Sequence, residues 1–370
     1  INISKWIMDR EFFRKRRSIT LRMASFVFFV ILIISFLFWF LSLRTQTLFT
    51  SKASDIEKKA VIEIMKNKGC VTDGLLNDYG NDMENAIKMI NRSECIYLHR
   101  AIETWLKPPD FEKISLAMKE LKNNVIVGMF LAEAIDKKAD YWQEKGEKKF
   151  DFSKMCRAGS HDYWINDSCK PNFASIEYRK YLKSVTEKAI DIGVQVFLFG
   201  QIYFQESNSG KKYAQEIVNN IRNYAKNKNK IVIIGAQTNN ISDEKYLRIF
   251  DFIEGGVGID KNGNIENGPC FSKWWKKPGD RCWALLWHND FAKKANNVFL
   301  HLDWSGFYDD DMSIFSRMDK PTRETTLKSL YNYFTSQNMG FMMPFLAVIN
   351  KEAPLCWGPS REFYSPDNLY

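Results

Sequence analysis

Histidine is scarce in this chain, and its cysteines do not occur in close pairs. Only four histidines are present among 370 residues, and none of the seven cysteines stands in a Cys-x-x-Cys arrangement. Structural zinc sites usually take their ligands from such closely spaced residues. The sequence therefore gives no support for a metal site, and we expect none.

The chain also lacks the short motifs that mark several large enzyme classes. It contains no P-loop, no G-x-S-x-G elbow, no H-E-x-x-H helix and no protein-kinase signature set. The glycine-rich stretch at 255–258 is not followed by the lysine of a P-loop, so we interpret it as a turn. These absences argue against nucleotide chemistry and serine hydrolysis, and they lead us to expect no cofactor.

Charge is absent from one long stretch near the N-terminus. Residues 23–43 are 21 residues without a charged side chain, and about 20 apolar residues allow a helix to cross a bilayer. Residues 1–22 carry seven basic and two acidic side chains, a net charge of +5. The positive-inside rule then places the N-terminus in the cytoplasm and the C-terminal domain in the periplasm or outside the cell. We predict a single-pass signal-anchor, because the apolar core of a cleaved signal peptide is shorter.

The basic balance of the chain is concentrated in that N-terminal segment. The formal net charge is +9, so residues 23–370 contribute only 9 − 5 = +4. Binding to a polyanion needs basic charge spread over a folded surface. We therefore expect no nucleic-acid partner. The expected partners are the lipid bilayer, a polysaccharide and other subunits of a membrane complex.

All seven cysteines follow the apolar run, which fits an oxidising compartment. Cysteines that are neighbours in the chain enclose short segments, and we predict that they form disulfides, with buried free thiols as the alternative. The predicted pairs are Cys70–Cys95, Cys156–Cys169 and Cys270–Cys282. This pairing leaves Cys356 without an assigned partner.

The region after the apolar run divides into two parts. Residues 44–123 contain helical patterns, beginning at the capping-box spacing of Ser54 and Glu57, and we expect a helical neck there. From residue 124 onward, short apolar strands alternate with amphipathic helices. The expected strands lie at 125–132, 194–204, 230–237, 250–259, 297–304 and 340–349. The expected helices lie at 175–192, 210–226, 243–249 and 322–337.

This alternation predicts an α/β domain with buried parallel strands and crossover helices. Residues 124–370 are 247 residues, and a (β/α)8 barrel typically has about 250. Because only six strands are evident, the barrel is either irregular or contains two strands that the pattern does not reveal. The alternative is an open doubly wound sheet, which usually has a G-x-G-x-x-G loop that is absent here. We favour a (β/α)8-type barrel at 124–370, preceded by a transmembrane helix and the neck.

Polar residues follow or interrupt almost every expected strand. In a barrel the catalytic groups project from the C-terminal ends of the strands. Glu254 and Asp303 each interrupt an apolar run, and a half-buried carboxylate has a raised pKa that suits general acid catalysis. We predict these two as catalytic, with Glu206 and Glu133 in reserve. Solvation of strand ends is the alternative explanation for each carboxylate.

Tryptophans gather in or beside the expected loops. Their flat faces suit the apolar faces of sugar rings, whereas loop packing or a protein interface would use them equally well. The predicted substrate-binding residues are Gln237, His301, Trp304 and Trp275.

Together, strand-end carboxylates, aromatic loops and an extracytoplasmic location resemble the broad superfamily of TIM-barrel glycoside hydrolases, over roughly residues 124–350. The resemblance implies that two carboxylates flank a glycosidic bond, one protonating the leaving oxygen and the other acting as nucleophile or base. We therefore expect a membrane-anchored, extracytoplasmic glycan-binding protein that acts as a glycoside hydrolase. The alternative is a non-catalytic barrel scaffold in a membrane or cell-envelope complex.

Overall fold

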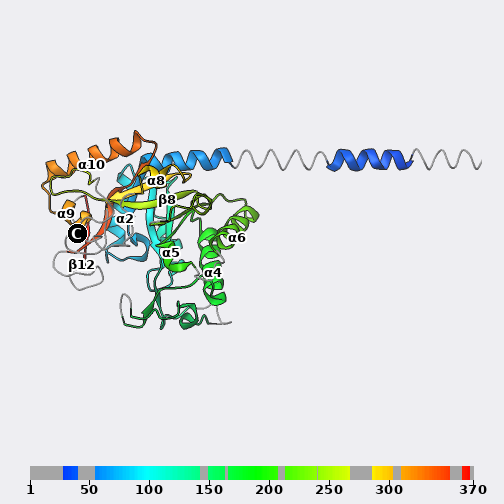
Figure 1. The fold of residues 1–370 in the computed structure, drawn as a ribbon, viewed down its shortest axis with the longest axis horizontal. Helices are drawn as coiled ribbons and strands as arrows, with labels where there is room; N and C mark the ends of the chain where they lie inside the picture. The colour runs from blue at the N-terminus through cyan, green and yellow to red at the C-terminus, as the bar shows by residue number, and fades with distance from the viewer. Residues whose placement is uncertain are drawn as a thin grey trace, which may run out of the picture. The chain divides into compact units, whose positions relative to one another are not determined.

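The chain folds as two units, residues 1–59 and residues 60–370. The computed structural model describes residues 28–40, 55–141, 149–162, 166–206, 213–239, 241–266, 286–302, 310–350 and 361–366. The second unit contains every strand of the described chain (Figure 1). The fold that positions a functional site is therefore the fold of this second unit.

In the first unit, residues 28–40 are helical and their large apolar side chains are exposed. Within the described ranges, no helix combines the length and the apolar character that a membrane span requires. The transmembrane helix expected at 23–43 stays a prediction of the sequence.

Ten strands form one largely parallel sheet in the second unit. Their order across the sheet is β10-β9-β8-β7-β6-β3-β2-β1-β11-β12. The strands are β1 (Gly69–Thr72), β2 (Tyr97–Glu103), β3 (Ile126–Leu131), β6 (Val196–Phe199), β7 (Ile233–Ala236), β8 (Phe252–Val257), β9 (Val298–Leu302), β10 (Gly340–Phe341), β11 (Met343–Asn350) and β12 (Arg361–Tyr364). A separate antiparallel pair consists of β4 (Ile135–Asp136) and β5 (Ser168–Cys169).

The large sheet closes on itself through residues 340–350. β10 pairs with β9, and β11 pairs with β1 at the other end of the parallel series. Only Met342 separates β10 from β11, and its N–H donates to the carbonyl oxygen of Leu300 at 2.7 Å. β1, β2, β3, β6, β7, β8, β9 and the β10–β11 segment therefore complete a circle in chain order, as in a (β/α)8 barrel. The predicted α/β barrel is confirmed, and the open doubly wound sheet is wrong.

Two strands of the barrel come from the region in which we expected a helical neck. Both β1 and β2 lie within 44–123, so the barrel begins well before the boundary expected at 124. The helical pattern there belongs to α2 (Met83–Arg92), which ends before β2. All seven residues of β2 are buried, and a short, fully buried strand cannot be told from a buried helix by periodicity alone.

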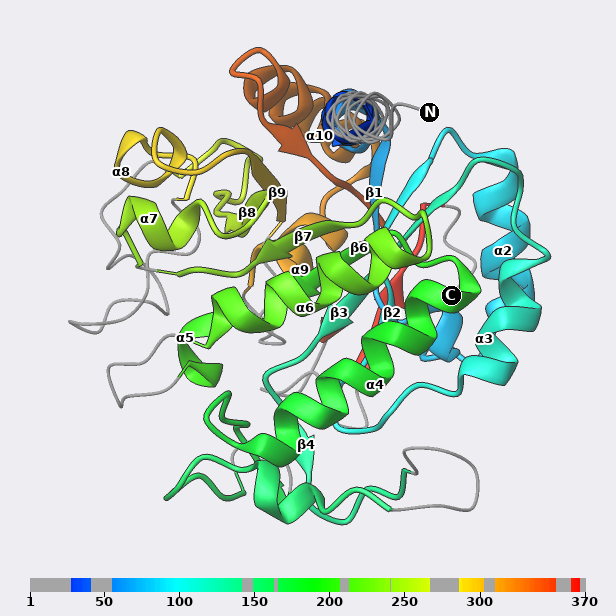
Figure 2. The same ribbon diagram turned by 90° about the vertical axis from the view of Figure 1, so that its right-hand side faces the viewer.

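Helices connect successive strands on the outside of the barrel. A helix at 55–68 precedes β1. The others are α2, α3 (Phe111–Met118), α4 (Ile176–Ile192), α5 (Ile202–Gln205), α6 (Ala214–Asn227), α7 (Glu244–Leu247), α8 (Asn289–Ala292), α9 (Asp311–Ser316) and α10 (Lys320–Thr335), with short 3-10 turns η1 (Leu75–Asn77) and η2 (Phe152–Met155). Figure 2 shows α4 and α6 lying side by side against the sheet. Ser175 caps α4 and Asp319 caps α10, each accepting a backbone N–H of the first turn.

Two of the three predicted disulfides are confirmed. Cys70 in β1 is bonded to Cys95 just before β2, on the N-terminal side of the barrel. Cys156 after η2 is bonded to Cys169 in β5, within the long connection between β3 and α4. Outside the described residues lie Cys270, Cys282 and Cys356.

Candidate functional site

Three strands carry the same two-residue pattern into the barrel interior, an aromatic residue followed two positions later by a polar one. The pairs are Tyr97 and His99 on β2, Phe252 and Glu254 on β8, and Phe299 and His301 on β9. Alternate residues of a strand face the same side of a sheet. The rings of Tyr97 and Phe299 lie 6.4 Å apart, and those of His99 and His301 lie 6.0 Å apart, although β2 and β9 are not neighbours in the sheet. These side chains therefore meet in the interior of the barrel.

The interior accordingly has two levels. We call the lower set, Tyr97, Phe252 and Phe299, the aromatic layer. We call the upper set, nearer the C-terminal ends of the strands, the histidine–glutamate cluster; it consists of His99, Glu254 and His301.

Glycines in neighbouring strands make room for the aromatic layer. A Cβ atom at Gly235 of β7 would lie 2.2 Å from the Phe252 ring, and one at Gly340 of β10 would lie 2.6 Å from the Phe299 ring. Real Cβ atoms do not approach other carbon atoms so closely, so any larger residue would displace these rings. The aromatic layer thus closes the barrel beneath the cluster.

Glu254 stands between the two histidines. Its Oε1 lies 2.6 Å from Nε2 of His301, and its Oε2 lies 3.7 Å from Nε2 of His99. The three side chains are 0–1% exposed. The other ring nitrogens are also engaged: Nδ1 of His99 lies 3.0 Å from the Tyr97 hydroxyl, and Nδ1 of His301 lies 2.6 Å from the carbonyl oxygen of Leu302.

Burial and the histidine contacts shift the pKa of the Glu254 carboxyl in opposite directions. Burial would raise the pKa of its carboxyl, but the charges of His99 and His301 and the hydrogen bond with His301 outweigh it and hold the pKa below the usual range. Burial also lowers the pKa of His99, against the pull of Glu254. The raised pKa that we expected for Glu254 is therefore wrong, because its histidine partners come from two other strands.

Two glutamines extend the cluster across the mouth of the barrel. Gln237, which follows β7, donates from Nε2 to Oε1 of Glu254 at 3.3 Å. Its own Oε1 accepts the backbone N–H of Gln201, which follows β6, at 3.1 Å. The Gln201 side chain donates to Oε1 of Glu133, just past β3, at 2.9 Å. Hydrogen bonds therefore link residues just past β3, β6 and β7 to Glu254 within β8.

The pKa of Glu133 is shifted in the opposite direction to that of Glu254. It is 3% exposed, and its Oε2 has no hydrogen-bond partner among the described residues. Burial raises the pKa of Glu133, although Arg100 and the Gln201 hydrogen bond oppose the shift. Gly200 provides the space for this carboxyl group, because a Cβ atom there would lie 2.2 Å from Oε2. The mouth thus holds a carboxyl that favours its protonated form.

A buried cation lies beside these groups. Arg100 has a φ of 60°, and its guanidinium is 3.9 Å from the centre of the Phe130 ring. Its Nη2 lies 2.8 Å from Glu103, and its Nε lies 3.5 Å from Asp73. Two carboxylates therefore compensate the charge of Arg100.

Glu206, which we predicted in reserve as a catalytic residue, instead stabilises a helix start. Its carboxylate accepts the backbone N–H groups of Tyr213 at 2.8 Å and Ala214 at 3.3 Å, at the beginning of α6. It also accepts the hydroxyl of Tyr246 at 2.9 Å. These bonds give Glu206 a structural role.

Of the other predicted site residues, four lie together at the barrel mouth and three lie outside the described residues. Gln237, His301, Glu254 and Glu133 belong to one hydrogen-bonded set at the barrel mouth. Outside the described residues lie Asp303, Trp304 and Trp275.

Several members of the site were not predicted from the sequence. They are His99, Arg100, Glu103, Asp73 and Gln201. A usable signal was present in Tyr97-Leu98-His99, which repeats the aromatic-x-polar spacing of Phe252-Ile253-Glu254 and Phe299-Leu300-His301.

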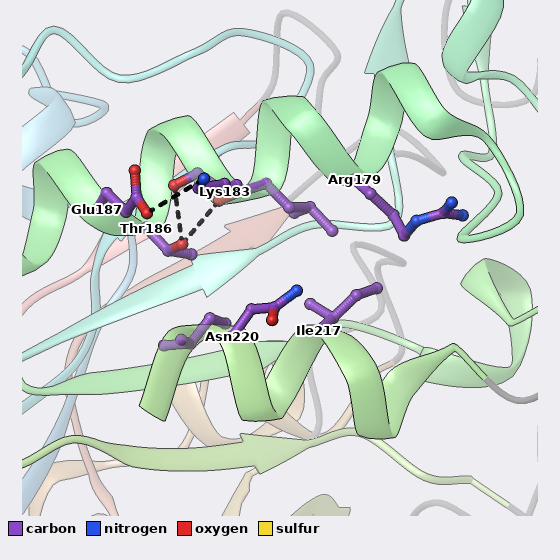
Figure 3. A pocket seen from close by; sticks show the side chains of 8 residues that line it. Arg179, Lys183, Thr186, Glu187, Ile217 and Asn220 are labelled. Carbon is purple, nitrogen blue, oxygen red and sulfur yellow. Dashed lines mark hydrogen bonds and ion pairs between the residues drawn. The ribbon is translucent and has the colours of Figure 1, made fainter. Parts of the chain in front are cut away.

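A second feature, a groove, lies on the outside of the barrel between α4 and α6 (Figure 3). Its lining comes from the two helices, including Arg179, Lys183 and Glu187 of α4 and Asn220 of α6. Lys183 lies 4.0 Å from Glu187, and the polar groups of the groove show no convergence like that at the mouth. We therefore do not regard the groove as a candidate functional site.

The architecture and the buried ionisable groups define an α/β barrel with a polar site at its C-terminal mouth. The sequence matches no family model and no curated protein. Solved structures similar to it include an isomaltulose synthase variant from Erwinia rhapontici, with 11% identity and a TM-score of 0.42 over 75% of this chain and 64% of that one.

Two further similar structures are glycoside hydrolases. The glycoside hydrolase domain of PelA from Pseudomonas aeruginosa has 9% identity and a TM-score of 0.34, over 68% of this chain and 94% of that one. A β-L-arabinopyranosidase from Geobacillus stearothermophilus has 9% identity and a TM-score of 0.28, and the match spans half of each chain. All three of these structures have a TM-score below 0.5 and at most 11% identity to this chain.

Proposed function

We propose that this chain is a membrane-anchored, extracytoplasmic glycan-binding protein whose barrel hydrolyses glycosidic bonds. The observation that carries the proposal is the hydrogen-bonded set at the barrel mouth, which joins Glu133 through Gln201 and Gln237 to Glu254. Glycosidases need carboxyl groups fixed in position together with hydrogen-bonding groups for sugar hydroxyls. The apolar run at 23–43 and the basic segment before it support the anchor and its orientation.

Glu133 is the proposed general acid. Its buried carboxyl has a raised pKa, and its Oε2 is not used by any other described group. A carboxyl with these properties keeps the proton that it must give to the leaving oxygen. Asp303, which lies outside the described residues, is proposed from the sequence as the second carboxylate, acting as nucleophile or base.

Glu254 has a different task in this scheme. Its carboxylate is enclosed between His99 and His301, and none of its surface is exposed. A side chain so enclosed acts by fixing charge at the base of the mouth and by orienting Gln237. The same complete burial favours a second candidate function, a non-catalytic barrel scaffold in which the polar level only holds the strands together.

The test is turnover by the full chain, purified in detergent, on a panel of cell-envelope polysaccharides. The readout is the release of new reducing ends. Replacing Glu133 by Gln is expected to lower kcat by about 100- to 10,000-fold, the usual contribution of a general acid. The matched control is Glu187→Gln, which removes a carboxyl on α4 whose pKa burial also raises. That control should retain full activity.

Equal turnover by wild type and Glu133→Gln would remove Glu133 from the mechanism. No turnover of any polysaccharide by correctly folded wild-type protein would favour the scaffold instead.

A further inference from the structure

Two facing polar atoms in the histidine–glutamate cluster have no hydrogen-bond partner among the described residues. They are Nε2 of His99 and Oε2 of Glu254, which lie 3.7 Å apart. This distance is too long for a direct hydrogen bond, and both side chains are buried. A buried polar group without a partner destabilises the folded protein. A cation held by both atoms would remove that cost.

The two histidine rings are oriented as metal ligands are. Nδ1 of His301 must carry a hydrogen, because it lies 2.6 Å from the carbonyl oxygen of Leu302, which can only accept. Nδ1 of His99 lies 3.0 Å from the Tyr97 hydroxyl. Each ring therefore uses Nδ1 for a supporting hydrogen bond and turns Nε2 toward Glu254. Metal-binding histidines are typically held in this way by a carbonyl or another polar group.

We propose that His99, Glu254 and His301 bind one divalent metal ion, with zinc as the best match. One ligand atom from each of the three residues lies within 4.8 Å of the others. Two imidazoles and one carboxylate are a donor set that zinc uses in sites with an open fourth position. Calcium and magnesium prefer oxygen ligands, so this set does not suit them.

The surroundings of the cluster are compatible with this proposal. The 2.6 Å contact between Nε2 of His301 and Oε1 of Glu254 places two of the proposed ligand atoms side by side. Arg100, a buried cation on the same strand as His99, is paired with Glu103 and Asp73. Its charge is therefore already compensated.

This inference is independent of the proposed hydrolase activity. The metal site can be tested without a substrate, and a failed metal test would leave the roles of Glu133 and Asp303 unchanged. If the metal is present, Glu254 is a ligand rather than a nucleophile.

The test measures zinc bound to the full chain. The protein is stripped with a chelator, supplied with ZnCl₂, freed of unbound metal and analysed by atomic emission. We expect about one zinc per chain for wild type, as in a site with a single set of protein ligands. His99→Gln and Glu254→Gln should each weaken zinc binding at least tenfold. The control, His161→Gln, changes an exposed histidine and should bind zinc as wild type does.

A supporting hydrogen bond and a spectroscopic readout sharpen the test. Tyr97→Phe removes the partner of His99 Nδ1 and should weaken zinc binding by about 10- to 100-fold. Co²⁺ added to the stripped wild type should give the strong visible absorption of a low-coordinate site. Zinc should also raise the Tm of wild type.

The wild-type measurements decide the matter even if a ligand variant does not fold. Stripped wild type that takes up no zinc and gives no Co²⁺ spectrum would overturn the proposal. So would equal zinc binding by wild type and folded His99→Gln, because the metal would then be held elsewhere.

Discussion

The aromatic layer and the histidine–glutamate cluster lie two residues apart on the same three strands. They differ in how completely their side chains are packed or hydrogen-bonded. Both are fully buried. The aromatic rings contact one another, with Phe252 and Phe299 at 4.9 Å, and glycines in adjacent strands leave room for them. In the cluster, an oxygen of Glu254 and a nitrogen of His99 have no hydrogen-bond partner among the residues that the structure describes. Close packing indicates that the lower level stabilises the barrel, and the polar atoms of the upper level are the ones that we propose to bind a metal ion.

The largest expected effect comes from removing one ring of the aromatic layer. Phe299→Ala deletes a fully buried ring that contacts Tyr97 and Phe252, and it should lower the free energy of unfolding by about 3–5 kcal/mol. Urea denaturation measures this loss. The folded variant should still bind zinc, because none of the proposed ligands is changed. A loss below about 1 kcal/mol would mean that the layer is not close-packed.

Strands within long apolar runs could be predicted from the sequence, whereas short strands next to helices could not. β8 and β9 were evident because long apolar runs surround Glu254 and His301. β1 has only four residues, and β2 follows α2 closely, so the local pattern was dominated by the helix. Barrel closure depends on the pairing of β1 with β11, residues far apart in the chain, and no local pattern reports such pairing.

The site was predictable to the extent that its residues interrupt apolar strands. Glu254 was identified by that rule, Glu133 and Gln237 by their position after strands, and His301 only as a predicted substrate-binding residue. His99 was missed because β2 was missed. The predicted direction of the Glu254 pKa shift was also wrong, because the shift depends on histidine rings contributed by β2 and β9. Burial can be inferred from a single strand, but the charge environment of a buried group requires the tertiary structure.

The two disulfides offer a second comparison: one joins Cys70 of β1 to Cys95 just before β2, and the other lies in the connection between β3 and α4. In the chain-entropy description, the sequence separation of 25 between Cys70 and Cys95 corresponds to about 3.5 kcal/mol, and the separation of 13 between Cys156 and Cys169 to about 3 kcal/mol. Replacing each pair by serine should therefore destabilise the protein by similar amounts, slightly more for the first. Denaturant unfolding of both variants under oxidising conditions provides the measurement.

The two disulfide variants should differ more clearly in function than in stability. The bond between Cys156 and Cys169 lies in the connection that follows Glu133, so its loss should lower turnover in the folded protein. Loss of the bond between Cys70 and Cys95 should leave turnover of the folded fraction unchanged. The opposite result would contradict the division between a stabilising lower level and a functional mouth.

The smallest expected effect is a gain in the free energy of unfolding when Glu133 at the barrel mouth is replaced by Gln. The folded-state pKa of Glu133 lies above its usual value of 4.5 because burial disfavours the charged form. The stability that its protonated form contributes is fully present below pH 4.5 and is lost as the pH rises through the folded pKa. Glu133→Gln cannot ionise and keeps an oxygen that accepts the Gln201 side chain. It should therefore be more stable than wild type at neutral pH, by on the order of 1 kcal/mol.

The pH dependence makes this last prediction specific. The advantage of Glu133→Gln should vanish near pH 4 and grow toward neutral pH, whereas Glu187→Gln, at a side chain that is 29% exposed on α4, should show a smaller change. Thermal unfolding of the three proteins across this pH range measures both trends. A variant that is more stable and yet inactive would show that Glu133 is kept at the mouth at a cost to stability, as expected of a catalytic acid and not of a residue that only holds a scaffold together. A Glu133→Gln variant that is less stable than wild type at neutral pH would contradict that assignment.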